Sequence, residues 1–210
     1  MSKKVIIFDM DGVLFDTIPY AREVFTKRHP GVTSEMYNEM HSGNYHDEAA
    51  KYAHLKIIET EEEKENHRMS YVEKKGKTAM FVGMKDLLKN LHHEGYLLAI
   101  NTNAFDKTCL PLLEYSQIKQ YFDFIVTADV TKDKVEKFKL IEEKYDREKK
   151  GMLFVTDALG DIRDADVAQV PTVAVTWGVQ DRSFFMRDPH PNLVGIVDTV
   201  DELAEFIKKY

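Results

Sequence analysis

The chain has very little cysteine, no concentrated positive charge and no long hydrophobic run. Cys109 is the only cysteine among 210 residues, which excludes an intrachain disulfide, and we expect it to be a small buried apolar side chain. The formal net charge is −7, without blocks of lysine and arginine, which argues against a nucleic-acid-binding surface. No apolar stretch approaches bilayer length or resembles a signal peptide. We therefore expect a cytoplasmic protein that has neither nucleic acid nor membrane as a partner.

The hydrophobic content of 43% is enough to form a sizeable core. Beyond about residue 79, strand-like apolar runs alternate with helical segments, a pattern typical of a parallel sheet with right-handed crossovers. We predict an α/β fold, a doubly wound and mostly parallel sheet built from residues 1–16 and 79–210, with an inserted α-helical cap at 17–78. The expected strands are 5–8, 96–101, 124–127, 152–156, 172–176 and 194–197, and the helices between them include 84–93, 107–116, 135–145, 161–168 and 198–209.

The most informative segment begins with an apolar run at 5–8 and continues into two acidic residues, Asp9 and Asp11. Continuous β-branched and aromatic residues favour a strand that is buried on both faces, and Gly12 allows the chain to turn where the strand ends. Ligands bind at the carboxyl ends of strands in open α/β sheets. Two close carboxylates repel one another unless a cation or a shared proton relieves them, which favours a hard divalent ion at this point.

Further polar residues follow other predicted strands. Thr102 and Asn103 come after the strand at 96–101, and Asp157 comes after the strand at 152–156. Lys134 precedes the next crossover helix on the same side, where its ammonium group could reach a phosphoryl oxygen or offset the carboxylates. Each of these residues alone could belong to an ordinary turn or helix start. Together with Asp9, they predict one site at one edge of the sheet.

Three segments resemble motifs of the haloacid dehalogenase (HAD) superfamily, and specifically of its small cap-bearing phosphatases such as phosphoglycolate phosphatase and β-phosphoglucomutase. Residues 8–17, Phe-Asp-Met-Asp-Gly-Val-Leu-Phe-Asp-Thr, are similar to the first motif almost letter for letter. Residues 100–103 resemble the second motif, and 155–161 resemble the fourth. The resemblance covers nearly the whole chain, and it implies a Rossmann-like catalytic core with a helical cap.

The resemblance also implies a covalent mechanism of phosphoester hydrolysis. Asp9 would attack phosphorus and become an aspartyl phosphate, whereas Asp11 would protonate the leaving alkoxide and later activate water. Thr102 and backbone amides near Asn103 would hold the oxygens that are not transferred, and Lys134 would neutralise charge. The expected substrate is a small phosphorylated metabolite, and the expected assembly is a monomer or a weak homodimer.

The cofactor implied by the resemblance is Mg²⁺. Its ligands would be Asp9, the backbone carbonyl of Asp11, and Asp157, whereas Asp161 would orient the water shell of the ion or Lys134. The chain departs from the family pattern at two points. The lysine of the third motif is commonly followed by proline, but Val follows Lys134, so Lys132 or Lys137 could take its place. Threonine also stands at position 156, where glycine is common.

The sequence argues against three alternatives to a phosphatase and leaves a fourth open. A dehalogenase needs the nucleophile but neither Mg²⁺ nor a proton donor, so Asp11 and Asp157 argue against it. A phospho-accepting receiver domain would have no inserted cap, and a binding protein without activity would have no reason to retain the whole set of reactive residues. A phosphomutase of the same family stays open, because it differs from a phosphatase in how the cap excludes water.

One polar turn interrupts the helical cap, at residues 41–46 (His-Ser-Gly-Asn-Tyr-His). We expect this turn to face the site and to contact the part of the substrate that is not transferred, although a plain surface turn is the alternative. Hinges are expected near Thr17-Ile18 and Gly76-Lys77. The eight histidines show no arrangement typical of a metal site, and we expect them at the surface.

Overall fold

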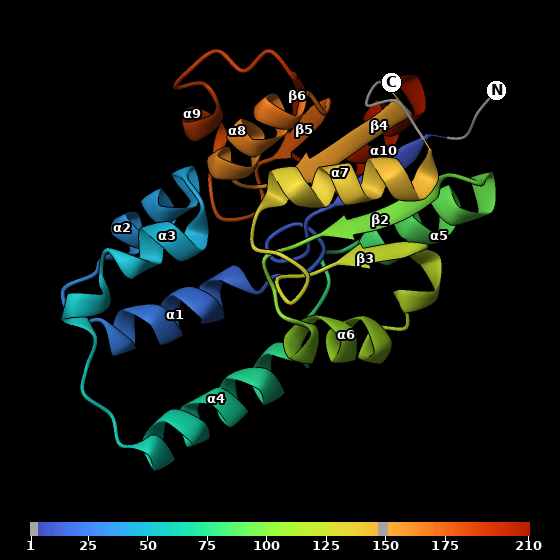
Figure 1. The fold of residues 1–210 in the computed structure, drawn as a ribbon. Coiled ribbons are helices and arrows are strands. Elements are labelled where there is room, and N and C mark those ends of the chain that lie inside the picture. Colours follow the sequence, from blue (N-terminus) through green and yellow to red (C-terminus); the bar gives the residue numbers. More distant parts are fainter. Residues whose placement is uncertain (1–3, 147–150) are drawn as a thin grey trace.

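A computed structural model describes residues 4–146 and 151–210 (Figure 1). Its sheet contains six strands in the order β3-β2-β1-β4-β5-β6, and every pair of neighbours is parallel. This order confirms the predicted doubly wound α/β fold, with β1 and β4 side by side in the middle of the sheet. The strands are β1 (Val5–Phe8), β2 (Leu97–Asn101), β3 (Phe124–Val126), β4 (Met152–Thr156), β5 (Thr172–Val175) and β6 (Leu193–Val197).

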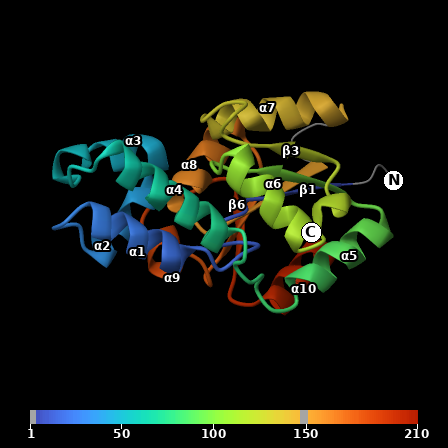
Figure 2. The same ribbon diagram turned by 90° about the horizontal axis from the view of Figure 1, so that it is seen from below.

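Helices cover both faces of the sheet, because each central strand is apolar on both faces (Figures 1 and 2). On β1, Ile6 and Phe8 pack into a cluster with α5, α6 and α10, whereas Val5 and Ile7 pack into another with α7 and α8. Cys109 is fully buried in the first cluster, as expected. The helices of the core are α5 (Met84–Glu94), α6 (Asp106–Tyr115), α7 (Lys134–Tyr145), α8 (Leu159–Ala168), α9 (Arg182–Phe185) and α10 (Val200–Lys209), and a 3-10 turn, η3, covers Lys119–Tyr121.

The segment inserted between β1 and α5 forms a helical cap beside the carboxyl ends of the strands (Figure 1). The long stretch of helix-forming residues before Gly76 is not one helix. It is divided, and its last part starts at a capping box in which Thr60 and Glu63 bind one another's backbone amides. The elements of the cap are α1 (Ile18–Arg28), α2 (Ser34–Glu39), η1 (Met40–Ser42), α3 (Tyr45–Ala50), η2 (Ala53–Leu55) and α4 (Glu61–Lys75).

The chain enters and leaves the cap at adjacent points. Phe15 and Met80 form an isolated antiparallel bridge, and the amide of Asp16 donates to the carbonyl of Ala79 over 3.1 Å. Both crossings lie next to the expected hinges. Two adjacent backbone segments therefore connect the cap to the core.

The polar turn of the cap packs against the start of α8. Gln180, which is 1% exposed, accepts from the amide of Leu159 and donates to the carbonyl of Asn38 over 2.9 Å. Gly160 lies so close to Gly43 that an added Cβ would be 2.3 Å from the carbonyl oxygen of Gly43. Helix α8 begins at Leu159 rather than at Asp161 as expected, and this earlier start brings Gly160 into the contact.

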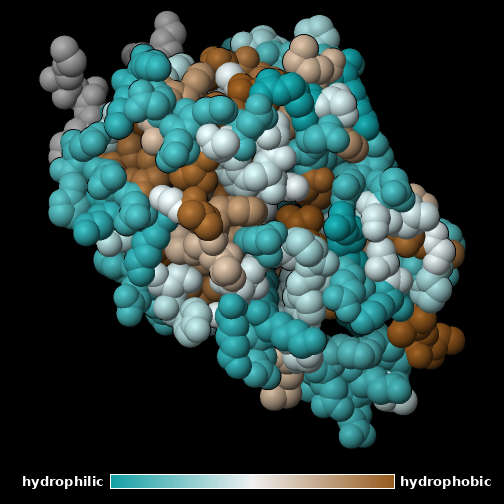
Figure 3. Space-filling view, turned by 180° about the vertical axis from the view of Figure 1, so that it is seen from behind, coloured by the Kyte–Doolittle hydropathy of each residue, from teal (hydrophilic) through white to brown (hydrophobic). Residues whose placement is uncertain are grey.

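The outer surface is largely hydrophilic in the view from behind (Figure 3). Across residues 4–146 and 151–210, none of the helices combines the length and the apolar character that a membrane-spanning helix needs.

Substitution of Gly160 by alanine tests this contact between cap and core. We expect the methyl group to push the turn at 41–46 off the core, because backbone atoms that meet a Cβ at 2.3 Å cannot give way by a side-chain rotation. Hydrogen exchange of the amides in this turn should become faster, and Tm should fall, since overpacking costs about 1–3 kcal/mol. Gly151→Ala is the matched control, because, apart from its chain neighbours, no atom of residues 4–146 or 151–210 lies within 4 Å of its added Cβ. Unchanged exchange in Gly160→Ala would contradict the contact.

Candidate active site

Asp9 lies directly after β1, at the centre of the carboxyl edge of the sheet. Its amide donates to the carbonyl of Val155 over 2.9 Å, and its Oδ1 accepts from the amide of Met10 over 2.7 Å. The other carboxylate oxygen lies 3.2 Å from Nζ of Lys134. Burial raises the pKa of Asp9 to about 7, and Asp161 and Asp11 add to this rise, whereas Lys134 opposes it. The side chain is thus a carboxylate in a crowded, poorly solvated position.

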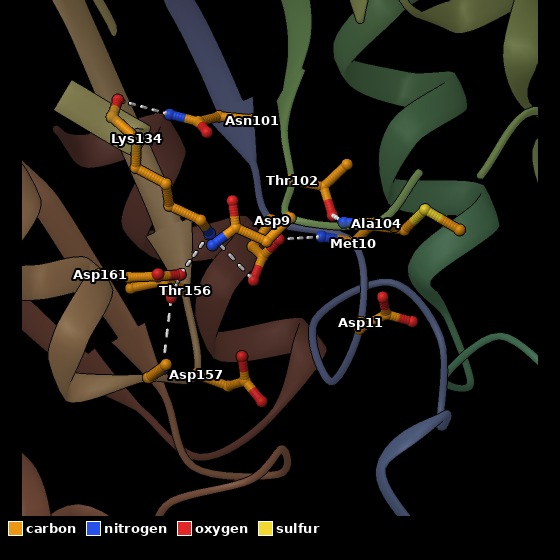
Figure 4. Close-up of polar contacts among 12 residues, drawn as sticks. Asp9, Met10, Asp11, Asn101, Thr102, Ala104, Lys134, Thr156, Asp157 and Asp161 are labelled. Atoms are coloured by element: carbon orange, nitrogen blue, oxygen red, sulfur yellow. Dashed lines mark hydrogen bonds and ion pairs between the residues drawn. The ribbon is translucent and has the colours of Figure 1, made fainter. Parts of the chain in front are cut away.

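Lys134 connects this carboxylate to a second one (Figure 4). It is the first residue of α7, it is 1% exposed, and its Nζ donates to Oδ2 of Asp161 over 2.6 Å. The same oxygen accepts from the hydroxyl of Thr156 over 2.7 Å, so the threonine that departs from the family pattern helps to hold Asp161. Burial would lower the pKa of Lys134, but the two carboxylates raise it above its ordinary value. Lys134 therefore stays charged.

Asp157 follows β4 and lies in a narrow space between two glycines. Its Oδ2 accepts from the amide of Val179 over 2.7 Å. A Cβ at Gly12 would lie 1.9 Å from this oxygen, and a Cβ at Gly178 would lie 2.1 Å from it. Gly12 also has a φ of 76°, so both the turn and the approach of the carboxylate require glycine there. Burial and the nearby Asp9 hold the pKa of Asp157 well above its usual range.

Two buried carboxylates that repel each other are the donors that Mg²⁺ prefers. Asp9 and Asp157 provide them, and they line one cavity together with Asp11. The part of the chain described by the structure holds no cluster of three or more histidine, cysteine, aspartate or glutamate side chains suited to a metal ion. The expected ligand set needs only two such side chains, because the ligand from Asp11 is its backbone carbonyl. The residues present thus fit the expected ion.

Asp11 faces the cap. Its Oδ2 accepts from Nζ of Lys75 over 2.7 Å, whereas its buried Oδ1 has no hydrogen-bond partner among the described residues. Lys75 is the last residue of α4 and is 4% exposed. Burial lowers its pKa, but Asp11 reverses this effect and leaves the pKa above its ordinary value. Sequence reasoning does not identify Lys75, since a lysine just before a glycine resembles an ordinary helix end.

The loop after β2 carries Thr102 and Asn103, and a second buried lysine holds it. Nζ of Lys137 donates to the carbonyl of Thr102 over 2.6 Å and to Oδ1 of Asn103 over 2.7 Å. The hydroxyl of Thr102 accepts from the amide of Ala104 over 3.0 Å, which leaves its own hydrogen available for a ligand. Burial and Lys134 lower the pKa of Lys137 to about 7.

The three candidate lysines of the third motif thus occupy different places. Lys134 contacts Asp9, and Lys137 contacts the loop that follows β2. Lys132 is exposed, and only its backbone carbonyl meets the cap, where it accepts from the side-chain amide of Asn44 over 3.3 Å. The geometry therefore favours Lys134 as the lysine that faces the reacting group.

A cavity of about 540 Å³ lies between the cap and the core. It is lined by all of the predicted site residues and by residues 41, 43, 45 and 46 of the polar turn. The expectation that the histidines of the cap are surface residues is wrong for His29, which is buried, and for His41 and His46, which are half-buried in the cavity wall. His41 and His46 belong to the turn that folds against α8 rather than into solvent, and His29 stacks on Phe25. The predicted core residues on the wall are Asp9, Asp11, Thr102, Asn103, Lys134, Asp157 and Asp161.

Replacement of Lys137 by methionine tests the support of the loop at 102–103. We expect kcat to fall by about tenfold or more, because the loss of two hydrogen bonds frees a loop whose groups must be placed to within a fraction of an ångström. Lys139→Met on the exposed face of α7 is the matched control and should leave kcat unchanged. Steady-state kinetics with an aryl phosphate measure both. Equal rates in the two variants would show that Lys137 does not position the loop.

The comparisons with known proteins agree with this geometry. Residues 6–175 match the family model described as haloacid dehalogenase-like hydrolase. A phosphoglycolate phosphatase from Mesorhizobium japonicum is 27% identical over 225 residues, which cover 98% of this chain and 96% of the relative. A haloacid dehalogenase-like hydrolase from Streptococcus pneumoniae shares the fold with a TM-score of 0.76 at 18% identity, over 98% of both chains. A candidate β-phosphoglucomutase from Thermotoga maritima does so with a TM-score of 0.75 at 20% identity, over 98% of this chain and 99% of that one. The chain belongs to the haloacid dehalogenase-like hydrolases.

Proposed function

We propose that the chain is a Mg²⁺-dependent phosphatase that hydrolyses a small phosphorylated metabolite through a phosphate carried on Asp9. The observation that carries this proposal is the position of Asp9. Its carboxylate lies on the cavity wall, 3.2 Å from the ammonium of Lys134, with Asp11 and Asp157 on the same wall. Phosphoryl transfer requires an aligned nucleophile and neutralised charge, and this arrangement supplies both.

In the first step, an oxygen of Asp9 forms a bond to phosphorus while the bond from phosphorus to the ester oxygen breaks. Asp11 gives its proton to the departing oxygen, so that the leaving group departs as an alcohol. The product is an acyl phosphate on Asp9. Lys134 neutralises charge on the phosphoryl oxygens, and the hydroxyl of Thr102 donates to one of them. Mg²⁺, when bound by Asp9, Asp157 and the carbonyl of Asp11, supplies further charge neutralisation.

In the second step, water attacks the phosphorus and Asp11 takes up its proton. Phosphate leaves, and the carboxylate of Asp9 is restored. Nζ of Lys75 donates to Oδ2 of Asp11 over 2.7 Å. Asp11 has to carry a proton in the first step, so this contact has to loosen when a substrate occupies the cavity.

Phosphoglycolate is the first substrate to assay, because the relative from Mesorhizobium japonicum carries that name and is similar over its whole length. A phosphomutase would use the same chemistry at Asp9, but it would return the phosphoryl group to a sugar phosphate instead of water. Release of inorganic phosphate from a single monoester separates the two functions.

Asp9→Asn should abolish turnover, because an amide cannot form the acyl phosphate. We expect kcat for p-nitrophenyl phosphate to fall by about 10⁴-fold or more, while the fold is retained. Asp16→Asn is the matched control, because it makes the same change within the same motif at a side chain that is exposed and does not line the cavity. Activity of Asp9→Asn within tenfold of the wild type would refute the role of Asp9 as nucleophile.

Removal of Mg²⁺ should abolish the phosphatase activity reversibly. Asp9, Asp157 and a phosphate dianion repel one another, so we expect no turnover in excess chelator and full recovery when Mg²⁺ is restored. Mg²⁺ should also raise Tm of the wild type, because binding to the native state stabilises it.

The same addition of Mg²⁺ should have little effect on Tm of Asp157→Asn. Asp188→Asn is the control, because this aspartate is exposed and remote from the cavity wall. Full activity in chelator, or an equal rise of Tm in Asp157→Asn, would contradict the metal site.

A further inference from the structure

The wall that the cap contributes to the cavity is aromatic. We call Phe25, Tyr37, His41, Tyr45 and Tyr71 the ring wall; all five line the cavity that also contains Asp9 and Asp11. They come from five different elements, namely α1, α2, η1, α3 and α4. The fold of the cap therefore brings together rings that are far apart in the sequence.

Four rings of the wall, those of Phe25, Tyr37, His41 and Tyr45, pack against one another. The ring centroids of Tyr37 and His41 are 5.1 Å apart, and those of His41 and Tyr45 are 5.0 Å apart. Phe25 continues the wall outward, with its centroid 5.5 Å from that of Tyr37. Such spacings are typical of packed aromatic groups. Tyr37 is 2% exposed and supports its neighbours from behind, whereas the other four rings are half-buried and can meet a ligand.

The ring wall is also uncharged at neutral pH. Burial lowers the pKa of His41 to about 4, so its imidazole is neutral. Burial raises the pKa of Tyr45 to about 12 and holds that of Tyr37 well above its usual range. A neutral aromatic surface binds apolar planar groups better than it binds carboxylates or phosphates.

The cations of the cap that line the cavity already have carboxylate partners. Lys75 pairs with Asp11, and Arg28 lies 2.5 Å from Glu59. Farther out, Lys64 pairs with Glu61 and Arg68 with Glu65. The core contributes Lys107, which is exposed and lies 5.7 Å from the centroid of Phe105. The ring wall itself thus contains no cation, and of these four cations of the cap only Lys75 is buried, where Asp11 binds it.

The size of the cavity leads to the same conclusion. About 540 Å³ lies within the range of pockets that hold drug-sized ligands. A two-carbon acid such as the glycolate part of phosphoglycolate would leave most of the ring wall without contacts. A larger leaving group is needed to fill it.

We propose that the natural substrate is a phosphomonoester whose leaving alcohol carries a planar aromatic ring, and that the ring binds against the ring wall. This inference rests on the proposed phosphatase function and specifies its substrate class. The ring could belong to a nucleoside, a pyridine or a phenol, since all three share a flat π-face that stacks on tyrosine and histidine. The phosphate would then lie at Asp9, with the ester oxygen toward Asp11 and the ring toward Tyr45.

Kinetics on matched substrates test the class. Adenosine 5′-monophosphate, pyridoxine 5′-phosphate and O-phosphotyrosine represent the three ring sources; 2-phosphoglycolate, glycerol 3-phosphate and glucose 1,6-bisphosphate have no aromatic ring. We expect at least one ring-bearing substrate to exceed all three others in kcat/KM by about 100-fold. If a substrate without an aromatic ring had the highest kcat/KM, the inference would be overturned but the phosphatase function would stand.

Variants of the ring wall test the contact itself. Tyr45→Leu and Tyr71→Leu should lower kcat/KM for the preferred ring-bearing substrate by about tenfold, mainly through KM, because the ring loses its stacking partner. Tyr52→Leu is the matched control, since this tyrosine of the cap does not line the cavity. An equal effect in all three variants, or no effect in any, would contradict stacking on the ring wall.

Direct binding separates this inference from the proposed function. Asp9→Asn, titrated calorimetrically with Mg²⁺ and each of the six phosphates, should bind a ring-bearing phosphate at least tenfold more tightly than phosphoglycolate. The binding comparison tests the inference even if the wild type hydrolyses none of the six phosphates. Absence of hydrolysis would refute the phosphatase function and would not by itself refute binding of the ring. Equal or weaker binding of all ring-bearing phosphates would overturn the inference.

Discussion

The site depends on the repulsion among buried carboxylates at the centre of the sheet. The parallel pairing of β1 with β4 forces the residues that follow these strands, Asp9 and Asp157, to the same edge. Burial deprives both of water and raises the pKa of each. Lys134 offsets part of this cost for Asp9, and Asp161 holds Lys134 in place. The negative charges that remain unbalanced are those that a divalent cation would neutralise.

The cap forms the other wall of the cavity. It covers the carboxyl edge, contributes Lys75 to Asp11, and encloses a cavity with neutral rings. Its contacts with the core include hydrogen bonds through Gln180, the close approach of Gly43 to Gly160, and the ion pair between Lys75 and Asp11. The carboxylates of the cavity wall thus lie on the core side, and the rings of the ring wall lie on the cap side. That division suits a substrate whose phosphate end meets the core and whose other end carries a ring.

The core of the site could be predicted from the sequence, because each of its residues follows an apolar strand. Asp9 and Asp157 each follow an apolar run, and the pattern of the run predicts both a strand and its direction in the sheet. The resemblance of 8–17 to a family motif adds their expected roles. Lys75 and the ring wall could not be predicted in this way. Their positions depend on how helices of the cap pack on one another, and helical periodicity describes only which face of each helix is apolar. Lys137 was one of three candidate lysines, and only tertiary contacts separate it from Lys134.

The adjacent entry and exit of the cap have a consequence for how such a protein can change. The backbone at Asp16 and at Ala79 is joined by one hydrogen bond of 3.1 Å, so the ends of the insertion meet as the ends of a short turn would. The entropy of loop closure grows only slowly with the length of the closed segment. Segments of very different length can therefore be accommodated between these two points without disturbing the pairing of β1 with β2. The catalytic sheet and the surface that recognises the substrate are in this sense separate modules, and one can be exchanged while the other is kept.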